Sequence, residues 1–327
     1  MRLKPQWTQA RRLISDRNSM IIRVLRLVKS TLMIAVQLPW TGISVFCPRM
    51  KSQAFELRDL LNPGFYAAWA AAQDPGAAHL REQSQEAREL PRRPLFSIIT
   101  PVFNPPPEVF DGLIRSIQKQ SYPWWELCLA NGSTDPAVSD LIVSWKAQDS
   151  RIRSVSMDNL GISGNSNEAL KLAAGEFIVL VDHDDLVAPH LLFEAAAVLN
   201  QEPSLDLLYY DEDMINLADR RCRPFFKPSS FHAAWLRKAN YLTHCVLRRE
   251  MVLNAGGFDP ALDGAQDWDL FFRCIEKTDR IAHIPKILYH WRMAPGSAAL
   301  GLGEKPYAVQ AQKRAISNHL GRLRSNS

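Results

Sequence analysis

Three carboxylates within four residues, Asp182, Asp184 and Asp185, directly follow the apolar run at residues 177–181. Carboxylates this close raise one another's pKa unless a cation or strong hydrogen-bond donors neutralise them. Mg²⁺ or Mn²⁺ prefers carboxylate oxygens, and water and phosphate oxygens fill its remaining positions. The spacing therefore predicts a site for Mg²⁺ or Mn²⁺ that can also receive a phosphate group.

Two other interpretations of the acidic run, and one of the Gly-containing segment at residues 161–164, are weaker. A helix cap accounts for Asp185, because a helix could begin near Pro189, but it leaves the other two acids unexplained. An EF-hand loop requires a central Gly and a distal Glu that are absent. A dinucleotide-binding loop at residues 161–164 lacks its third Gly and follows the third apolar run, whereas that motif follows the first strand.

The elements that must position the acids alternate beyond Pro94 between short apolar runs and helical stretches. The apolar runs lie at residues 96–102, 127–130, 152–156 and 177–181, and the helix candidates at 107–120, 136–148 and 163–174. Each helix candidate opens with a Pro or Ser suited to a first turn. This alternation predicts an α/β fold, with a doubly wound, mainly parallel sheet covered by helices on both faces.

Polar residues follow all four apolar runs. They are Asn104, then residues 131–135, then 158–161, then 182–185. Ligands bind such sheets at the carboxyl ends of the strands, so these residues are expected to line one polar cleft.

A longer ordered set of motifs resembles the family 2 glycosyltransferases of the GT-A fold, closest to the branch that builds bacterial surface polysaccharides, including rhamnosyltransferase-like members. The resemblance spans residues 94–322, and the ordered set is specific although each piece is short. The motifs are residues 96–104, 131–135, 159–163, 182–185, 210–213, 226–228, 240–241, 256–259, 266–269 and 289–292.

The resemblance implies roles for residues that match the family's motifs. It implies a nucleotide-sugar pocket formed by Thr100, Pro101, Asn131, Ser133, Asp135, Asn159, Asp182 and Arg292, with Asp182 near the ribose and Arg292 near the pyrophosphate. It places Mg²⁺ or Mn²⁺ on Asp184, with His290 completing the shell; a structural histidine at a strand end is the alternative for His290.

The resemblance also implies that Asp267 is the catalytic base. Asp267 and Asp269 open a predicted helix at residues 268–276, where the helix dipole favours a negative group, so capping is the alternative for either one. Which of the two is the base stays open. The acid that usually precedes this motif is Gln266, and the acid that usually follows the second strand is Ala130, which leaves the nucleoside base undefined.

The implied reaction is an inverting transfer of a sugar from a nucleotide diphosphate-sugar to a hydroxyl of a saccharide or lipid-linked saccharide, in assembly of O-antigen or exopolysaccharide. The replacements at Ala130 and Gln266 keep a catalytically silent scaffold as the alternative. The acidic run at residues 211–213 is a weaker site candidate, because such a run is usually a solvated turn.

Charge is distributed unevenly along the 327 residues. Of 39 basic and 34 acidic residues, ten and one lie before Ser52, so the rest of the chain has 29 basic residues against 33 acidic ones. An acidic body argues against nucleic-acid binding. The arm combines Arg23, Arg26 and Lys29 with an apolar stretch, which favours an in-plane anchor on an anionic membrane surface, with a single span or a plain extension as alternatives.

The predicted organisation has five parts. They are a basic, membrane-associating arm (1–52), a helical extension broken at residues 62–64 and 74–76 (53–93), a nucleotide-sugar-binding half (94–200), an acceptor-binding and catalytic half (201–295) and a C-terminal helical tail (296–327). Five cysteines without a C-x-x-C spacing predict free thiols in a reducing compartment. The expected location is the cytoplasm, at the inner membrane.

Overall fold

A computed structural model of the chain describes residues 48–216, 218–231, 242, 244–293 and 306–325. The predicted membrane-associating arm lies almost wholly in residues 1–47, outside this part, as does the 240–241 motif. No helix among the described residues is long and apolar enough to cross a membrane. Four described cysteines are free thiols, and Cys128, Cys245 and Cys274 are buried, whereas Cys47 lies outside the description.

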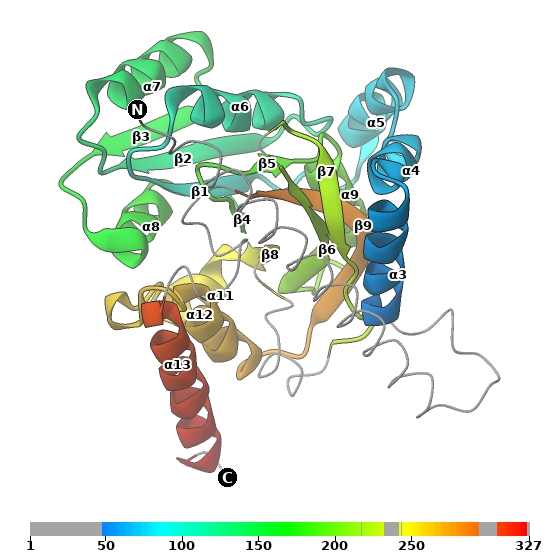
Figure 1. The fold of residues 1–327 in the computed structure, drawn as a ribbon. Coiled ribbons are helices and arrows are strands. Elements are labelled where there is room, and N and C mark those ends of the chain that lie inside the picture. The colour runs from blue at the N-terminus through cyan, green and yellow to red at the C-terminus, as the bar shows by residue number, and fades with distance from the viewer. Residues whose placement is uncertain (1–47, 217, 232–241, 243, 294–305, 326–327) are drawn as a thin grey trace, which may run out of the picture.

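The described strands form one nine-stranded sheet in the order β3-β2-β1-β4-β8-β6-β9-β5, with β7 paired to β6 (Figure 1). β1, β2, β3, β4, β6 and β9 run in one direction, while β5, β7 and β8 run against it, so the predicted mainly parallel sheet is confirmed. The strands are β1 Phe96–Val102, β2 Trp125–Asn131, β3 Ile152–Ser156, β4 Phe177–Leu180, β5 Leu186–Val187, β6 Leu207–Ile215, β7 Arg221–Phe225, β8 Cys245–Arg248 and β9 Ile281–Arg292.

Helices cover both faces of the sheet, because neighbouring residues of each buried strand feed two different hydrophobic cores. Ile98 packs in the core that includes α6, α7 and α9, whereas Ile99 packs in the core that includes α8, α11, α12 and α13 (Figure 1). The helices are α6 Pro107–Gln118, α7 Pro136–Gln148, α8 Gly161–Leu172, α9 Leu191–Gln201, α11 Arg249–Asn254, α12 Gln266–Ile275 and α13 Pro306–Ser325, with a 3-10 turn at Pro260–Leu262.

The helix pattern follows from the sequence. In α6, Pro107 occupies the first turn, where its missing N–H costs nothing, and Phe110, Leu113, Ile114 and Ile117 recur at helical spacing on the buried face. The amphipathic stripe therefore fixes which side of α6 faces the sheet.

The N-terminal extension consists of α3 Pro48–Leu61, α4 Phe65–Gln73 and α5 Ala77–Glu89. Helices α3 and α4 pack against β7, and α5 packs against α9 (Figure 1). The two breaks fall where Asn62-Pro63-Gly64 and Asp74-Pro75-Gly76 predict them. Gly64 has a φ of 91°, a conformation that strains other residues. The predicted helical extension is confirmed.

Candidate active site

The loops after β1 and β2 are tied together by side chains that the sequence placed at strand ends. The Asn104 side-chain oxygen accepts hydrogen bonds from the backbone N–H groups of Thr134 at 2.9 Å and Asp135 at 3.2 Å. The backbone N–H of Asn104 in turn donates to the Ser133 hydroxyl at 2.9 Å. These bonds hold the two strand ends as one surface.

The loop after β3 joins the same surface at Gly132. A Cβ at this position would lie 2.9 Å from the Cα of Asn159 and 3.0 Å from the side-chain nitrogen of Asn165. The Asn159 side-chain oxygen accepts a hydrogen bond from that nitrogen at 3.0 Å. The close approach of the two loops therefore requires glycine at position 132.

The predicted nucleotide-pocket residues include buried residues of the strands and exposed residues of the loops. Thr100 is fully buried, and its hydroxyl has no hydrogen-bond partner among the described residues. The Pro101 carbonyl lies 3.0 Å from Nδ1 of His183 in the acidic loop, which ties the end of β1 to that loop. Asn131 is buried at the end of β2, whereas exposed Asp135 caps α7 by accepting from the N–H of Ala137 at 2.9 Å.

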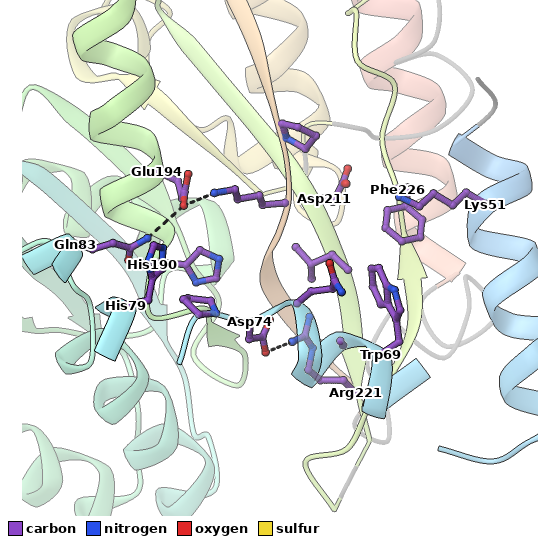
Figure 2. Close-up of a pocket in the computed structure, with 16 residues that line it drawn as sticks. Lys51, Trp69, Asp74, His79, Gln83, His190, Glu194, Asp211, Arg221 and Phe226 are labelled. Carbon is purple, nitrogen blue, oxygen red and sulfur yellow. Dashed lines mark hydrogen bonds and ion pairs between the residues drawn. The ribbon is translucent and has the colours of Figure 1, made fainter. Parts of the chain in front are cut away.

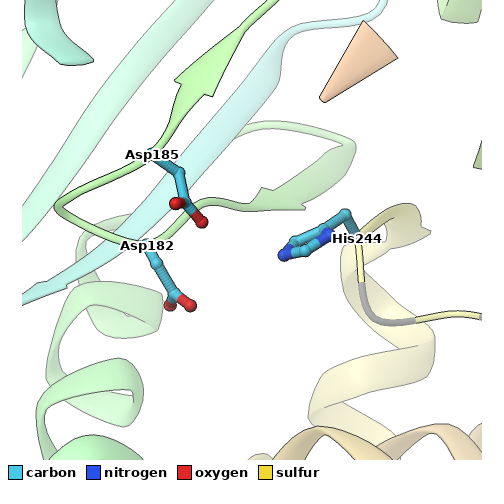
Figure 3. Close-up of side chains that lie close together, drawn as sticks. All are labelled: Asp182, Asp185 and His244. Atoms are coloured by element: carbon cyan, nitrogen blue, oxygen red, sulfur yellow. The ribbon is translucent and has the colours of Figure 1, made fainter. Parts of the chain in front are cut away.

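A metal-ligand cluster lies beside these loops. Asp182, Asp185 and His244 offer one ligand atom each, and the three atoms lie within 4.8 Å of one another. Figure 3 shows the two carboxylates of the loop after β4 facing the imidazole, which immediately precedes β8. Carboxylate oxygens and a neutral imidazole nitrogen suit Mg²⁺ or Mn²⁺, so the donor set fits the predicted metal.

A buried ion pair orients His244 toward the cluster. Oε2 of Glu212 lies 2.9 Å from Nδ1 of His244 and 2.9 Å from Nζ of Lys227. Burial opposes ionisation of Glu212, but Lys227 and His244 outweigh it and lower its pKa to about 2. An ionised carboxylate only accepts hydrogen bonds, so Nδ1 is the donor and Nε2 remains for a metal. The ring also stacks on Tyr289, at 3.5 Å between centroids.

Asp185 is fully buried at the end of the loop that also carries Asp182. Its two oxygens accept hydrogen bonds from the Tyr289 hydroxyl at 2.6 Å and from the backbone N–H of Arg292 at 2.7 Å. Burial raises the pKa of Asp185, and the neighbouring Asp184 and Asp182 carboxylates raise it further. The helix-cap alternative for Asp185 is wrong, because α9 begins at Leu191 and short strand β5 follows the acidic loop.

The predicted metal ligands Asp184 and His290 do not belong to this cluster. Nδ1 of His290 lies 2.6 Å from Oδ1 of Asp213, on the neighbouring strand β6. The Asp184 carbonyl accepts a hydrogen bond from Nε of Arg292 at 2.7 Å, which brings that guanidinium next to the acidic loop. Asp184 and His290 stay a prediction, and the side-chain geometry favours Asp182, Asp185 and His244.

Asp267 lies in the first turn of α12 and interacts electrostatically with Asp182 and His244 of the cluster. Desolvation raises its pKa to about 6, and the Asp182 carboxylate contributes to the increase, while His244 opposes it. Asp269 is instead buried and accepts from Nε of Arg273 at 2.7 Å. Of the two candidates for a base, Asp267 is therefore the one near the metal-ligand cluster.

The sequence interpretation gave no role to Lys227 or His244, and it treated Glu212 only as a weaker site candidate. The solvated-turn interpretation of residues 211–213 is wrong, because all three acids are buried inside β6 and each lies 2.6–2.9 Å from a histidine nitrogen. The apolar residues 207–210 immediately before them were the available signal for a buried strand. His244 had a similar signal, since it borders the apolar run at residues 245–247.

Comparison with known proteins identifies the class to which this fold and site belong. Residues 97–256 match the model of the family described as glycosyl transferase family 2. The chain belongs to glycosyl transferase family 2. The resemblance seen in the sequence motifs is thereby confirmed.

The most informative relatives are longer proteins. The chain is 41% identical over 249 residues to the protein y4gI of Sinorhizobium fredii, covering 75% of this chain and 27% of that protein. It is 34% identical over 260 residues to the O-antigen biosynthesis protein RfbC of Myxococcus xanthus, covering 79% of this chain and 20% of that protein. The chain thus spans between a fifth and just over a quarter of the length of these relatives.

Among solved structures, residues 1–349 of TarS from S. aureus superpose with a TM-score of 0.52 at 22% identity, covering 68% of this chain and 66% of that one. This likeness confirms the GT-A fold.

Proposed function

We propose that the chain is an inverting glycosyltransferase, which moves a sugar from a nucleotide diphosphate-sugar to an acceptor hydroxyl. The observation that carries the proposal is the position of Asp267, a carboxylate with a pKa of about 6, near the cluster of Asp182, Asp185 and His244. A general base is most effective when its pKa lies near the working pH, and the opposing cluster suits a metal-bound diphosphate.

In the proposed reaction, Asp267 accepts the proton of the acceptor hydroxyl as its oxygen bonds to the anomeric carbon. The bond from that carbon to the diphosphate oxygen breaks, and the leaving nucleoside diphosphate takes the bonding electrons. Attack from the side opposite the leaving group inverts the configuration. Asp182, Asp185 and His244 would hold Mg²⁺ or Mn²⁺, which supplies positive charge to the leaving group. Arg292 adds a fixed guanidinium beside the acidic loop.

The donor is proposed to bind at residues 94–200, on Thr100 of β1, Asn131 at the end of β2 and the joined loops that follow β1, β2 and β3. Support comes from the hydrogen bonds that join these loops into one surface. Further support comes from TarS, whose structures were determined in complex with UDP and with UDP-GlcNAc. Residues 201–295, which carry His244 and Asp267, are proposed to bind the acceptor. The similarity to RfbC favours a saccharide acceptor in surface-polysaccharide assembly.

The test is a pair of matched substitutions in α12. Asp267→Asn should lower transfer by about 10²–10⁴-fold, because the base is lost, while Mn²⁺-dependent UDP binding by calorimetry stays within about twofold. Asp269→Asn should retain transfer in proportion to folded protein, because its carboxylate is buried and bonded to Arg273. Near-normal transfer by Asp267→Asn, or loss confined to Asp269→Asn, would disprove the assignment of the base.

A catalytically silent scaffold is the second candidate, and Gln266 is the observation that favours it. Its side-chain oxygen accepts a hydrogen bond from the N–H of Gly264 at 2.9 Å, so this position serves the turn before α12 and supplies no carboxylate. Release of UDP from UDP-sugars by the wild-type chain, and its loss in Asp267→Asn, separates an enzyme from a scaffold. A scaffold would bind the nucleotide without releasing product.

A further inference from the structure

A second cavity lies between the N-terminal helices and the sheet. Its volume is about 370 Å³, at the lower end of the ~300–1,000 Å³ usual for small-molecule sites. Sixteen residues from α3–α5, α9 and the β6, β7 and β9 region line it, and Asp182, Asp185, His244 and Asp267 are not among them (Figure 2). We call this cavity the side pocket. It is separate in its lining from the candidate active site.

A break in the pairing of β9 shapes one wall of the side pocket. The register between β6 and β9 shifts after Tyr210, and the three β9 residues at this irregularity, Pro285, Lys286 and Ile287, all line the cavity. Bulges of this kind bend a strand and re-aim its side chains, often next to binding sites. Two and five residues beyond Ile287, Tyr289 and Arg292 of the same strand contact Asp185. β9 therefore passes from the side pocket to the candidate active site.

The charges in the side pocket are balanced and already engaged. Three basic and three acidic side chains line it. Arg221 pairs with Asp74 at 2.5 Å, and Lys286 pairs with Glu194 at 2.5 Å (Figure 2). Asp211 accepts from Nε2 of His283 and from the N–H of Lys227, while Nζ of Lys51 lies 3.9 Å from the ring centroid of Phe226. A charged ligand would have to disrupt one of these pairs, so the pocket suits an uncharged one.

One buried polar atom of the side pocket has no partner within the described chain. This atom is Nδ1 of His190, a residue that is only 5% exposed. Burial lowers the pKa of His190 to about 4, so the imidazole is neutral at physiological pH. A neutral imidazole nitrogen can donate to a hydroxyl or accept from one, according to its tautomer. Buried polar atoms are usually paired, so the described chain leaves one hydrogen-bonding requirement unmet at a residue that lines the pocket.

Two aromatic rings complete the lining. Trp69 and Phe226 lie 6.1 Å apart between centroids and are held by Phe55, so they form a rigid apolar wall. Sugars combine an apolar C–H face with hydroxyls that both donate and accept hydrogen bonds. The pocket offers the matching combination of aromatic rings, the exposed amide of Gln73, and the unpaired imidazole nitrogen.

We propose that the side pocket binds one or two residues of an uncharged saccharide, at a site distinct from the site of transfer. The choice of ligand class rests on the proposed function, since a glycan acceptor is the saccharide that such a transferase meets. A growing chain held in the side pocket would be retained close to β9 and the transfer site between additions.

The test measures binding of maltose, lactose and methyl α-rhamnoside by ligand-observed NMR, with glucuronate and inorganic phosphate as charged comparators. At least one uncharged sugar should bind in the millimolar range, more tightly than either comparator. His190→Phe keeps a ring of similar shape but removes the unpaired nitrogen, and it should weaken that binding about tenfold. Gln73→Trp, at an exposed position of the pocket lining, should block it without disturbing the core.

The controls separate this inference from the proposed function. Asp267→Asn, and wild type saturated with UDP and Mn²⁺, should bind the sugar as the wild type does. Binding that His190→Phe and Gln73→Trp leave unchanged, or that Asp267→Asn abolishes, would overturn the side-pocket site. So would tighter binding of a charged comparator, or no binding by any uncharged sugar at about 50 mM. A chain that binds sugars in the side pocket but transfers none would refute only the proposed function.

Discussion

At the residue scale, the candidate site depends on pairing each ionisable group with a particular neighbour. Glu212 is ionised because Lys227 and His244 outweigh its burial, whereas Asp267 has a raised pKa because desolvation dominates and Asp182 adds to it. Two carboxylates in one region of the molecule thus have pKa values shifted in opposite directions, which suits them to different roles. Glu212 orients a ligand, and Asp267 can accept a proton near neutral pH.

The raised pKa of Asp267 predicts the pH dependence of transfer. The base must be deprotonated, so kcat/KM should rise with pH through a limb at about 6 and then level off. A bound cation favours the carboxylate and moves the limb to lower pH. The measurement is a pH–rate profile of wild type and of the residual activity of Asp267→Asn. An acid limb that persists unchanged in Asp267→Asn would assign it to another group.

The contact of Glu212 with His244 predicts a loss of metal affinity on substitution. Glu212→Gln removes the charge that fixes Nδ1 of His244 as the donor, and it should weaken Mn²⁺ binding about 10–100-fold in an EPR titration. The matched control is Asp211→Asn, since this neighbouring acid lies next to His283. Equal affinity losses in the two variants would show that Glu212 contributes no more than a generic buried acid.

At the element scale, β6 connects the N-terminal helices with both halves of the site. The hydroxyl of Tyr66 in α4 donates to Asp213 of β6 at 2.7 Å, and the other oxygen of Asp213 lies 2.6 Å from His290 of β9. Arg221 of β7 also donates to Asp213 at 2.6 Å. The helical extension is therefore fastened to the strands that carry Glu212 and Arg292, and it is an integral part of the described fold.

The Tyr66 contact predicts a specific stability loss. Tyr66→Phe leaves the ring in place but removes a buried hydrogen bond to a carboxylate, which should lower the free energy of unfolding by about 1.5–3 kcal/mol. Tyr307→Phe is the control, because Tyr307 is 57% exposed and should change this free energy by less than about 0.5 kcal/mol. Urea unfolding measures both. Indistinguishable midpoints for Tyr66→Phe and wild type would mean that the bond does not hold α4.

At the scale of the whole molecule, local pattern predicted the fold well. β1, β3 and α7 have the predicted limits, and both breaks in the N-terminal helices fall at the Pro-Gly signals. These elements have continuous apolar runs, amphipathic stripes or strong breakers, so their signal lies within a few residues. The assignment of Asp267 as the base stays a prediction that comes from the order of the motifs.

The pairing of side chains across the sheet could not be predicted in the same way. The link from Glu212 to His244 joins residues that are 32 positions apart, and it depends on β8 pairing with β6. The three acids of β6 looked like a solvated turn because burial of a charge requires partners, and their partners come from β7, β9 and the segments beside β7 and β8. His244, the proposed metal ligand, was missed for the same reason.

The central claim is that Asp182, Asp185 and His244 hold the cation that binds the donor diphosphate, facing Asp267. Anomalous diffraction from a crystal containing Mn²⁺ and UDP tests it most directly. The account predicts one manganese peak about 2–2.5 Å from Nε2 of His244 and from a carboxylate oxygen of Asp182, in contact with the diphosphate, with Asp267 across the site. A peak on Asp184 and His290, with His244 out of reach, would contradict it.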